Sequence, residues 1–197
     1  MKGNEPLSNV SLIVITYNEE SNIKRCLESA DGVGEIIVVD SFSTDSTVAI
    51  ANSMGAAVFQ RPYISAADQK NWAVAKAGRD WILVLDADES LSVELRTEIE
   101  RTLGSPCHDG YWLKRRNAFL GKRIRFCGWQ CDKVLRLFRR GAGSYPAKAV
   151  HEKLELKGRR GKLRGFLDHN PYRDLDDYMQ RMRSYSRRGA EDLFKRE

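Results

Sequence analysis

Four short apolar runs in the first hundred residues constrain the fold more than any other feature of the sequence. They are VSLIVIT (10–16), EIIVVD (35–40), AAVFQ (56–60) and WILVLD (81–86). Strands that are apolar at nearly every position are buried on both faces, as in parallel sheets. Helical patterns separate the runs at residues 20–30, 44–54, 64–77 and 91–103. This alternation predicts an α/β fold in which helices flank a mostly parallel sheet.

Local signals mark the ends of these helices. Three glycines stand where a helix would end: Gly55, Gly78 and Gly104. Ser43 or Thr44 can cap the second helix, and Asp88 or Ser90 can cap the fourth.

The pattern changes near Asp109. Alternating segments joined by Gly-rich turns predict antiparallel strands or hairpins added to one edge of the sheet: DGYWLKRRNAFLGKRIRF, KVLRLFRR and VHEKLEL. From Asp174 the sequence predicts a helix with apolar residues along one side and arginines around it. At 197 residues and 42% hydrophobic content, we expect one domain with a first half at 1–104 and a second at 105–197.

Charge is distributed unevenly between the halves. Residues 1–100 carry 8 Lys and Arg against 16 Asp and Glu, whereas residues 101–197 carry 25 against 11. A basic second half favours an anionic partner, which could be a phosphorylated substrate, an acidic membrane surface or nucleic acid. The alternative is a basic face that only meets solvent.

The sequence has no apolar run of about 18 residues and no signal-peptide pattern, so we expect neither a membrane span nor export. The four cysteines lack the spacing of a secreted disulfide framework, which fits a cytoplasmic protein. Cys127 and Cys131 form the one close pair, and His108, His151 and His169 are scattered singly. This spacing disfavours a structural zinc site.

Acidic residues follow the fourth apolar run, at Asp86, Asp88 and Glu89. Ligands of open parallel sheets lie at the carboxyl ends of the strands. An Asp-x-Asp at that place can hold Mg²⁺ or Mn²⁺, and the cation can bridge to a diphosphate and neutralise its charge as it leaves. Asp40, at the end of the second run, can bind a ribose or a base edge. Neither G-x-G-x-x-G nor G-x-x-x-x-G-K-[ST] is present.

Three segments together resemble the nucleotide-sugar-binding half of family 2 glycosyltransferases, which have the GT-A-type, Rossmann-like fold. The segments lie within residues 9–104 and are ITYNEESNIKRCLES, IIVVDSFSTDST and QKNWAVAKAGRDWILVLDADE. Later segments are similar to the bacterial lipopolysaccharide-core β-glucosyltransferase branch of that family. They are GWQCDKVLRLFRR, VHEKL and DHNPYRDLDDYMQRMRSYS.

The resemblance implies a role for each matched residue. Those expected to bind a nucleotide-diphosphate sugar, with a UDP-sugar first among the candidates, are Thr16, Tyr17, Asn18, Glu19, Asp40, Ser41, Lys70, Asn71, Asp86 and Asp88. Asp88 would also ligate the divalent cation, Mn²⁺ or Mg²⁺. Inversion by a single displacement needs a base opposite the leaving group, and Glu152 is favoured over Asp132. Glu152 could instead form an ion pair, and Asp132 could shape a turn.

The second half would bind the acceptor, which we expect to be an anionic glycan or glycolipid. Trp129, Arg136 and His151 are candidates for contact with the acceptor or the diphosphate, and Arg139 and Arg140 could join Arg136 in holding acceptor phosphates. The last helix could lie on the cytoplasmic face of the inner membrane, pack on the domain or serve a dimer.

Two other function classes share some of these features. A sugar nucleotidyltransferase would have a Gly-rich loop bearing Arg and Lys after the first strand, and TYNEESN is unlike it. A nucleic-acid-binding module would use the basic half, but it leaves the acids at the strand ends unexplained and its sequence signatures are missing.

Overall fold

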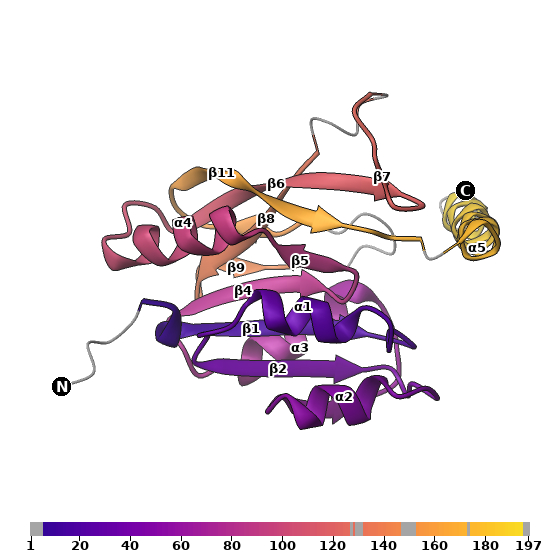
Figure 1. The fold of residues 1–197 in the computed structure, drawn as a ribbon, viewed down its shortest axis with the longest axis horizontal. Coiled ribbons are helices and arrows are strands. Elements are labelled where there is room, and N and C mark those ends of the chain that lie inside the picture. Colours follow the sequence, from indigo (N-terminus) through magenta and orange to yellow (C-terminus); the bar gives the residue numbers. More distant parts are fainter. Residues whose placement is uncertain (1–5, 127, 129–131, 147–152, 173, 195–197) are drawn as a thin grey trace.

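The computed structural model describes residues 6–126, 128, 132–146, 153–172 and 174–194, and Figure 1 shows their fold. Four parallel strands form one half of the main sheet in the order β3-β2-β1-β4. They are β1 (Val10–Thr16), β2 (Glu35–Asp40), β3 (Ala57–Gln60) and β4 (Trp81–Asp86), which confirms the predicted strands.

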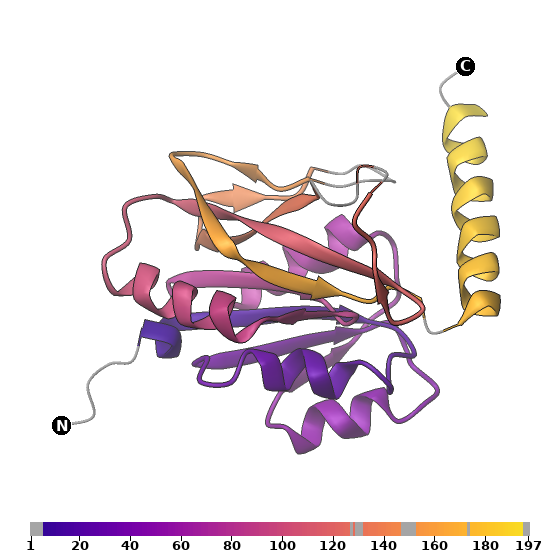
Figure 2. The same cartoon turned by 45° about the horizontal axis from the view of Figure 1, so that its top comes forward.

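Helices cover both faces of this sheet. The helices are α1 (Ile23–Ser29), α2 (Thr47–Ser53), α3 (Ala66–Lys76) and α4 (Val93–Gly104), with a short 3-10 turn η1 (Pro6–Asn9) before β1. α1, α2 and α4 lie on one face and α3 on the other (Figures 1 and 2). Successive residues of β1 point to opposite faces, so Leu12 joins the core beneath α1 and Ile13 joins the core beneath α3. Two covered faces explain why the strands are apolar at nearly every position.

The second half of the chain extends the same sheet in the order β4-β8-β6-β11-β5. Its strands are β5 (Glu89–Leu91), β6 (Gly110–Phe119), β7 (Lys122–Arg123), β8 (Lys133–Arg139), β9 (Gly143–Ser144), β10 (Glu155–Leu156) and β11 (Arg160–His169). Because β5 begins three residues after β4 ends yet pairs with β11 at the far edge, the sheet curls back toward its centre.

The prediction of antiparallel additions is partly correct. β8 runs antiparallel to both β4 and β6, and the pairs β6/β7 and β9/β10 are also antiparallel. β11 was not predicted, and it pairs parallel with β6. A parallel pair joins residues about fifty positions apart, for which the local pattern carries no signal.

The caps differ from those that the sequence suggested. Ser92 caps α4, where its side chain accepts a hydrogen bond from the Leu95 N–H at 3.2 Å. Asp88 and Ser90 therefore do not cap this helix. At α2 the cap residue is Ser46, and Asp45 accepts the Thr47 N–H at 3.0 Å. The acids after β4 are thus left for another role.

Helix α5 (Leu175–Phe194) confirms the predicted C-terminal helix and stands at the side of the sheet (Figures 1 and 2). Its first turn docks through three rings, Phe119, Tyr172 and Tyr178, whose centroids lie 5.0 to 5.7 Å apart in edge-to-face pairs. Leu175 and Met182 are exposed. Across the described residues, no helix has both the length and the apolar character that a bilayer crossing requires.

We expect Gly165→Ala to destabilise the fold, because Gly165 brings β11 into direct contact with the backbone of α4. A Cβ atom at this position would lie 2.5 Å from Leu95 Cα and 2.7 Å from Leu95 N. Overpacking against backbone should lower the free energy of unfolding by about 2–3 kcal/mol in urea denaturation. Gly189→Ala is the control, since nothing lies within 4 Å of its added atom and the free energy of unfolding should hold or rise. Equal stability of the two variants would contradict the close packing.

Candidate active site at the carboxyl ends of the parallel strands

Three polar segments meet at one edge of the sheet, where β1, β2 and β4 end. Thr16 is paired with Asp40, and Ile15 is paired with Asp86. The residues predicted after these strands therefore lie side by side, at the right of Figure 1.

Hydrogen bonds join the segment after β1 to the segment after β2. Asn18 adopts a positive φ of 53°, a conformation that asparagine tolerates better than most residues. Its Oδ1 accepts the Thr44 N–H at 2.8 Å, and its own N–H donates to Ser43 Oγ at 2.8 Å. Tyr17, beside it, is 57% exposed. The two segments form one rigid polar rim.

Asp40 and Ser41, at the base of this rim, form hydrogen bonds within the protein. Asp40 is fully buried and accepts hydrogen bonds from the Ser43 N–H at 2.9 Å and from Gln60 Nε2 at 3.0 Å. Ser41 Oγ accepts from Gln69 Nε2 at 3.1 Å. Both residues lie where the sequence placed them, with their side chains engaged by the protein.

Three basic side chains neutralise the carboxylates of Asp86 and Glu89. Asp86 Oδ1 lies 3.2 Å from Lys70 Nζ, and Oδ2 contacts Arg136 Nη2 and lies 3.9 Å from Arg115 Nη2. Glu89, fully buried, receives Arg115 Nε at 2.8 Å and Arg136 Nη2 at 3.2 Å. Burial opposes ionisation of Asp86, but Arg136, then Lys70 and Arg115, outweigh burial and hold the pKa of Asp86 well below its usual range.

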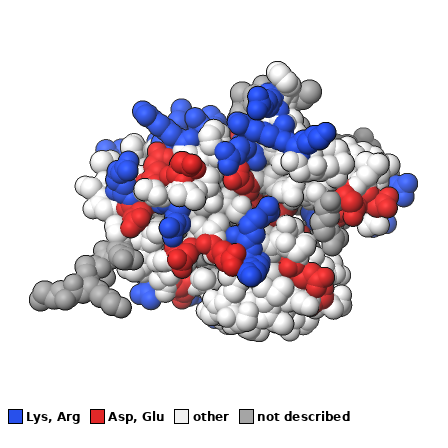
Figure 3. Space-filling model, in the orientation of Figure 1, with Lys and Arg blue, Asp and Glu red and all other residues white. Residues whose placement is uncertain are grey.

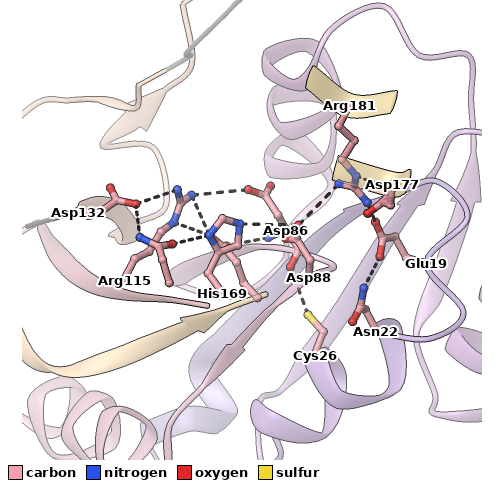
Figure 4. A network of polar contacts seen from close by, with 12 residues as sticks. Glu19, Asn22, Cys26, Asp86, Asp88, Arg115, Asp132, His169, Asp177 and Arg181 are labelled. Atoms are coloured by element: carbon pink, nitrogen blue, oxygen red, sulfur yellow. Dashed lines mark hydrogen bonds and ion pairs between the residues drawn. The ribbon is translucent and has the colours of Figure 1, made fainter. Parts of the chain in front are cut away.

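Asp88 has a different environment two residues later. Its Oδ1 is buried and has no hydrogen-bond partner among the described residues. Its Oδ2 lies 3.7 Å from His169 Nε2 and 4.0 Å from Arg181 Nη1, as Figure 4 shows. A buried carboxylate oxygen without a donor costs free energy unless a ligand supplies the missing contact.

The His169 ring faces Asp88 through its Nε2 atom. Its Nδ1 lies 2.7 Å from Asn117 Oδ1, and Asn117 Nδ2 donates to Asp132 at 3.3 Å. Because Asp132 is an acceptor, the Asn117 oxygen must face the histidine, so His169 Nδ1 donates this hydrogen bond. The other ring nitrogen, Nε2, faces the Asp88 carboxylate, where it could form an ion pair with that carboxylate or bind a cation between them.

These two residues fit a cation that a substrate helps to bind. Within the described ranges, no three His, Cys, Asp or Glu side chains cluster closely enough to hold a metal by themselves. Mg²⁺-type sites commonly use one or two protein ligands, with substrate phosphates and water completing the shell. Asp88, with its buried free oxygen, and His169 could supply the protein part of such a site.

Comparison with known proteins decides the family. Residues 11–194 match the sequence model described as Glycosyl transferase family 2. The chain belongs to this glycosyltransferase family. Membership favours this class over the nucleotidyltransferase and nucleic-acid-binding alternatives.

Individual relatives agree with the assignment. The glycosyltransferase is 32% identical to the lipopolysaccharide core biosynthesis glycosyltransferase LpsC of Rhizobium meliloti, over 90% of this chain and 68% of LpsC. It is 30% identical to an uncharacterized glycosyltransferase of Rickettsia typhi, over 96% of this chain and 69% of that protein. The chain thus spans about two thirds of these relatives.

The fold is also shared with a solved glycosyltransferase. The structure of S. aureus TarS 1–349 superposes with a TM-score of 0.62 at 17% identity, covering 82% of this chain and 60% of that one. This likeness confirms the predicted GT-A fold.

Several site residues of the glycosyltransferase have placements that the sequence did not indicate. Asn71 accepts the Tyr145 N–H at 2.9 Å and donates to the Tyr145 carbonyl at 2.7 Å, so its amide anchors that segment. Arg136 is 5% exposed and lies beneath Asp86. Arg139 pairs with Trp81 at the opposite end of β4, so the group of arginines expected to hold acceptor phosphates does not meet.

Of the two candidate bases, Asp132 lies within the described residues and Glu152 does not. Asp132 lies 3.4 Å from Arg115 Nη1 and also accepts from Asn117, at the edge of the acidic site. Glu152, together with Trp129 and His151, lies outside the described residues. The close cysteine pair, Cys127 and Cys131, does so as well.

Three residues at the site were not identified from the sequence, and they are Arg115, His169 and Arg181. His169 was counted as an isolated histidine, and the pairing of His169 with Glu89 brings it to Asp88. Arg181 was seen as one of several arginines on the last helix. Its position depends on how α5 docks, which residue spacing does not encode.

We expect Arg136→Met to destabilise the glycosyltransferase, because the buried Glu89 and the half-buried Asp86 would lose a shared basic partner. Removing one partner of a buried ion pair should lower the free energy of unfolding by about 3 kcal/mol, measured in guanidinium chloride. Arg140→Met, at the exposed opposite end of β8, is the matched control and should stay within about 0.5 kcal/mol of the wild type. A stable Arg136→Met variant with weakened acceptor binding would instead support the role predicted from the sequence.

Proposed function

We propose that this glycosyltransferase transfers a sugar from a UDP-sugar to an anionic glycan or glycolipid, with a divalent cation and with inversion at the anomeric carbon. The observation that carries the proposal is the contrast between two acids at the end of β4. Both oxygens of Asp86 lie beside basic side chains, whereas Asp88 has a buried oxygen without a hydrogen-bond partner among the described residues and lies 3.7 Å from His169 Nε2. Asp88 is therefore the acid left for a cation and its diphosphate.

The cation site would be formed by Asp88 and His169, and Mn²⁺ or Mg²⁺ held there would neutralise the charge on the departing diphosphate. Lys70 and Arg136 hold Asp86 in place, and about a third of the Asp86 side chain, 31%, stays exposed. This carboxylate can accept hydrogen bonds from hydroxyls of the ribose or the sugar. In this proposal Asn71 contributes by fixing the segment at Tyr145.

The rim formed after β1 and β2 suits the nucleoside. Thr16, Asn18, Glu19 and Ser41 offer polar groups there, above the buried Asp40. Tyr17 and Phe42 follow adjacent strand ends with 57% and 52% of their surface exposed, so either ring can stack on a base. The same fold holds UDP-GlcNAc in the S. aureus TarS 1–349 complex, which has a TM-score of 0.63 with this chain. We therefore favour UDP as the nucleotide.

The base and the acceptor would come from the second half. Asp132 is engaged by Arg115 and Asn117, which favours Glu152 as the group that takes the proton of the acceptor hydroxyl. Trp129 and His151 are proposed to act beside Glu152, on the acceptor or the diphosphate.

Three observations support an anionic, lipid-carried acceptor. The relative LpsC is described as acting in lipopolysaccharide core biosynthesis. Residues 101–197 carry 25 basic against 11 acidic residues, and Figure 3 shows Lys and Arg gathered over β6, β7 and β11. Leu175, Met182 and Phe194 of α5 are exposed, and a membrane surface could cover them. Peripheral association with an anionic membrane would then bring enzyme and acceptor together.

The proposal predicts metal-dependent nucleotide binding that requires Asp88. In a thermal-shift panel of UDP, GDP, TDP and CDP, we expect UDP with Mn²⁺ to raise the midpoint, and a chelator to remove the rise. Asp88→Asn should abolish this rise, because the cation loses its carboxylate ligand. Asp80→Asn, at the opposite end of β4, should keep it. Stabilisation of Asp88→Asn equal to that of the wild type, or no stabilisation of the wild type by any nucleotide with metal, counts against the proposal.

The assignment of Glu152 as the base predicts that variants of Glu152 and Asp132 lose activity to different extents. Glu152→Gln should lower kcat by about 10²–10⁴-fold with an unchanged donor KM, since a base acts on the acceptor proton rather than on donor binding. Asp132→Asn should cost far less. NMR of the product of an α-linked donor should show a β linkage. A larger loss in Asp132→Asn would transfer the role to Asp132, and an α product would refute inversion.

A further inference from the structure

Arg181 links the C-terminal helix to the candidate cation site. Its Nη2 lies 3.3 Å from Glu19 Oε1, and its Nη1 lies 4.0 Å from Asp88 Oδ2. Figure 4 shows the guanidinium between these two carboxylates, above the ends of β1 and β4. A residue from the last helix thus reaches two acids of the donor half.

The guanidinium is held in this position from its own helix. Asp177, one turn earlier, accepts a hydrogen bond from Arg181 Nε at 3.0 Å. Tyr178 packs against Phe119 and Tyr172, which fixes the docking of the first turn of α5. A guanidinium side chain stays charged across the physiological pH range. Arg181 is therefore a positioned, permanent cation.

A permanent cation beside Asp88 has opposite effects on two ligands. A bare divalent cation at the free oxygen of Asp88 would meet the like charge of Arg181 a few ångströms away. A diphosphate placed between the two cations would be attracted by both, and a guanidinium can bind two phosphate oxygens at once. The site should then accept the cation and the diphosphate together better than the cation alone.

We propose that Arg181 binds the diphosphate of the donor and makes cation binding at Asp88 depend on that diphosphate. This inference rests on the proposed function and adds a donor-binding residue from α5. It also gives the site a preference for nucleoside diphosphates over monophosphates, which present fewer oxygens to bridge the two cations. Asp177 positions Arg181 from the same helix, and Glu19 does so from the segment after β1.

The test measures Mn²⁺ binding by electron paramagnetic resonance, with and without UDP, on the full chain. Arg181→Gln should bind Mn²⁺ alone a few-fold more tightly, because the like charge is gone, and should bind UDP with Mn²⁺ about ten-fold more weakly, because a charge-assisted contact is lost. The preference for UDP over UMP should fall by a similar factor. Arg181→Lys should lie between this variant and the wild type.

Arg183→Gln is the matched control, since Arg183 is an exposed arginine of the same helix, and it should behave like the wild type. Thermal unfolding of each variant verifies that it is folded. The opposite signs of the two expected changes separate this role from a loss of structure, which would weaken both.

Three results would overturn the inference. If Arg181→Gln binds Mn²⁺ more tightly both alone and together with UDP, Arg181 occupies the site only in the absence of the donor and is displaced when the donor binds. If Arg181→Gln leaves binding unchanged, or weakens the binding of Mn²⁺ alone and of UDP with Mn²⁺ equally, the role of Arg181 is structural. If the wild type itself fails to bind UDP with Mn²⁺, the proposed function fails, whereas wild-type binding that Arg181→Gln leaves unchanged refutes this inference alone.

Discussion

The pairing of Asp86 and Glu89 with three basic side chains is the interaction on which the site depends. A strand that ends in clustered acids would be unstable in a covered sheet if those acids repelled each other. Lys70 comes from α3, Arg115 from β6 and Arg136 from β8, and together they neutralise Asp86 and Glu89. The acidic first half and the basic second half of the chain are therefore joined beneath the donor edge. Because a partnerless buried charge is costly, this cluster also fixes where β6 and β8 lie relative to β4.

Because Asp86 is neutralised by basic side chains, the two acids of the Asp-x-Asp have different roles. One carboxylate belongs to the internal network, and the other keeps a free oxygen at the mouth of the site. The curl of the sheet then brings His169 to the free acid, and the docking of α5 brings Arg181. In the proposed function, the first half thus builds the donor-binding edge of the sheet, and His169 and Arg181 of the second half complete it.

Much of this architecture could be predicted from the sequence, because its signals are local. Continuous apolar runs identified β1, β2 and β4 and placed Asp86 and Asp88 at the end of β4, and the resemblance gave these acids their expected roles. The positions of His169, Arg115 and Arg181 could not be predicted, since they depend on a parallel pair between β6 and β11 and on the docking of one ring cluster. Arg136 was a candidate for contact with the acceptor or the diphosphate, whereas the antiparallel register of β8 buries it under Asp86. Glu152, Trp129 and His151 stay predictions.

The central claim is that Asp88, and not Asp86, holds a cation together with the donor diphosphate. The most direct measurement is the anomalous difference map of a crystal soaked with Mn²⁺ and UDP. We expect a manganese peak about 2.0–2.3 Å from the free Asp88 oxygen, with His169 Nε2 and the diphosphate in the same shell. A peak at Asp86, or bound UDP with no peak at Asp88, would contradict it.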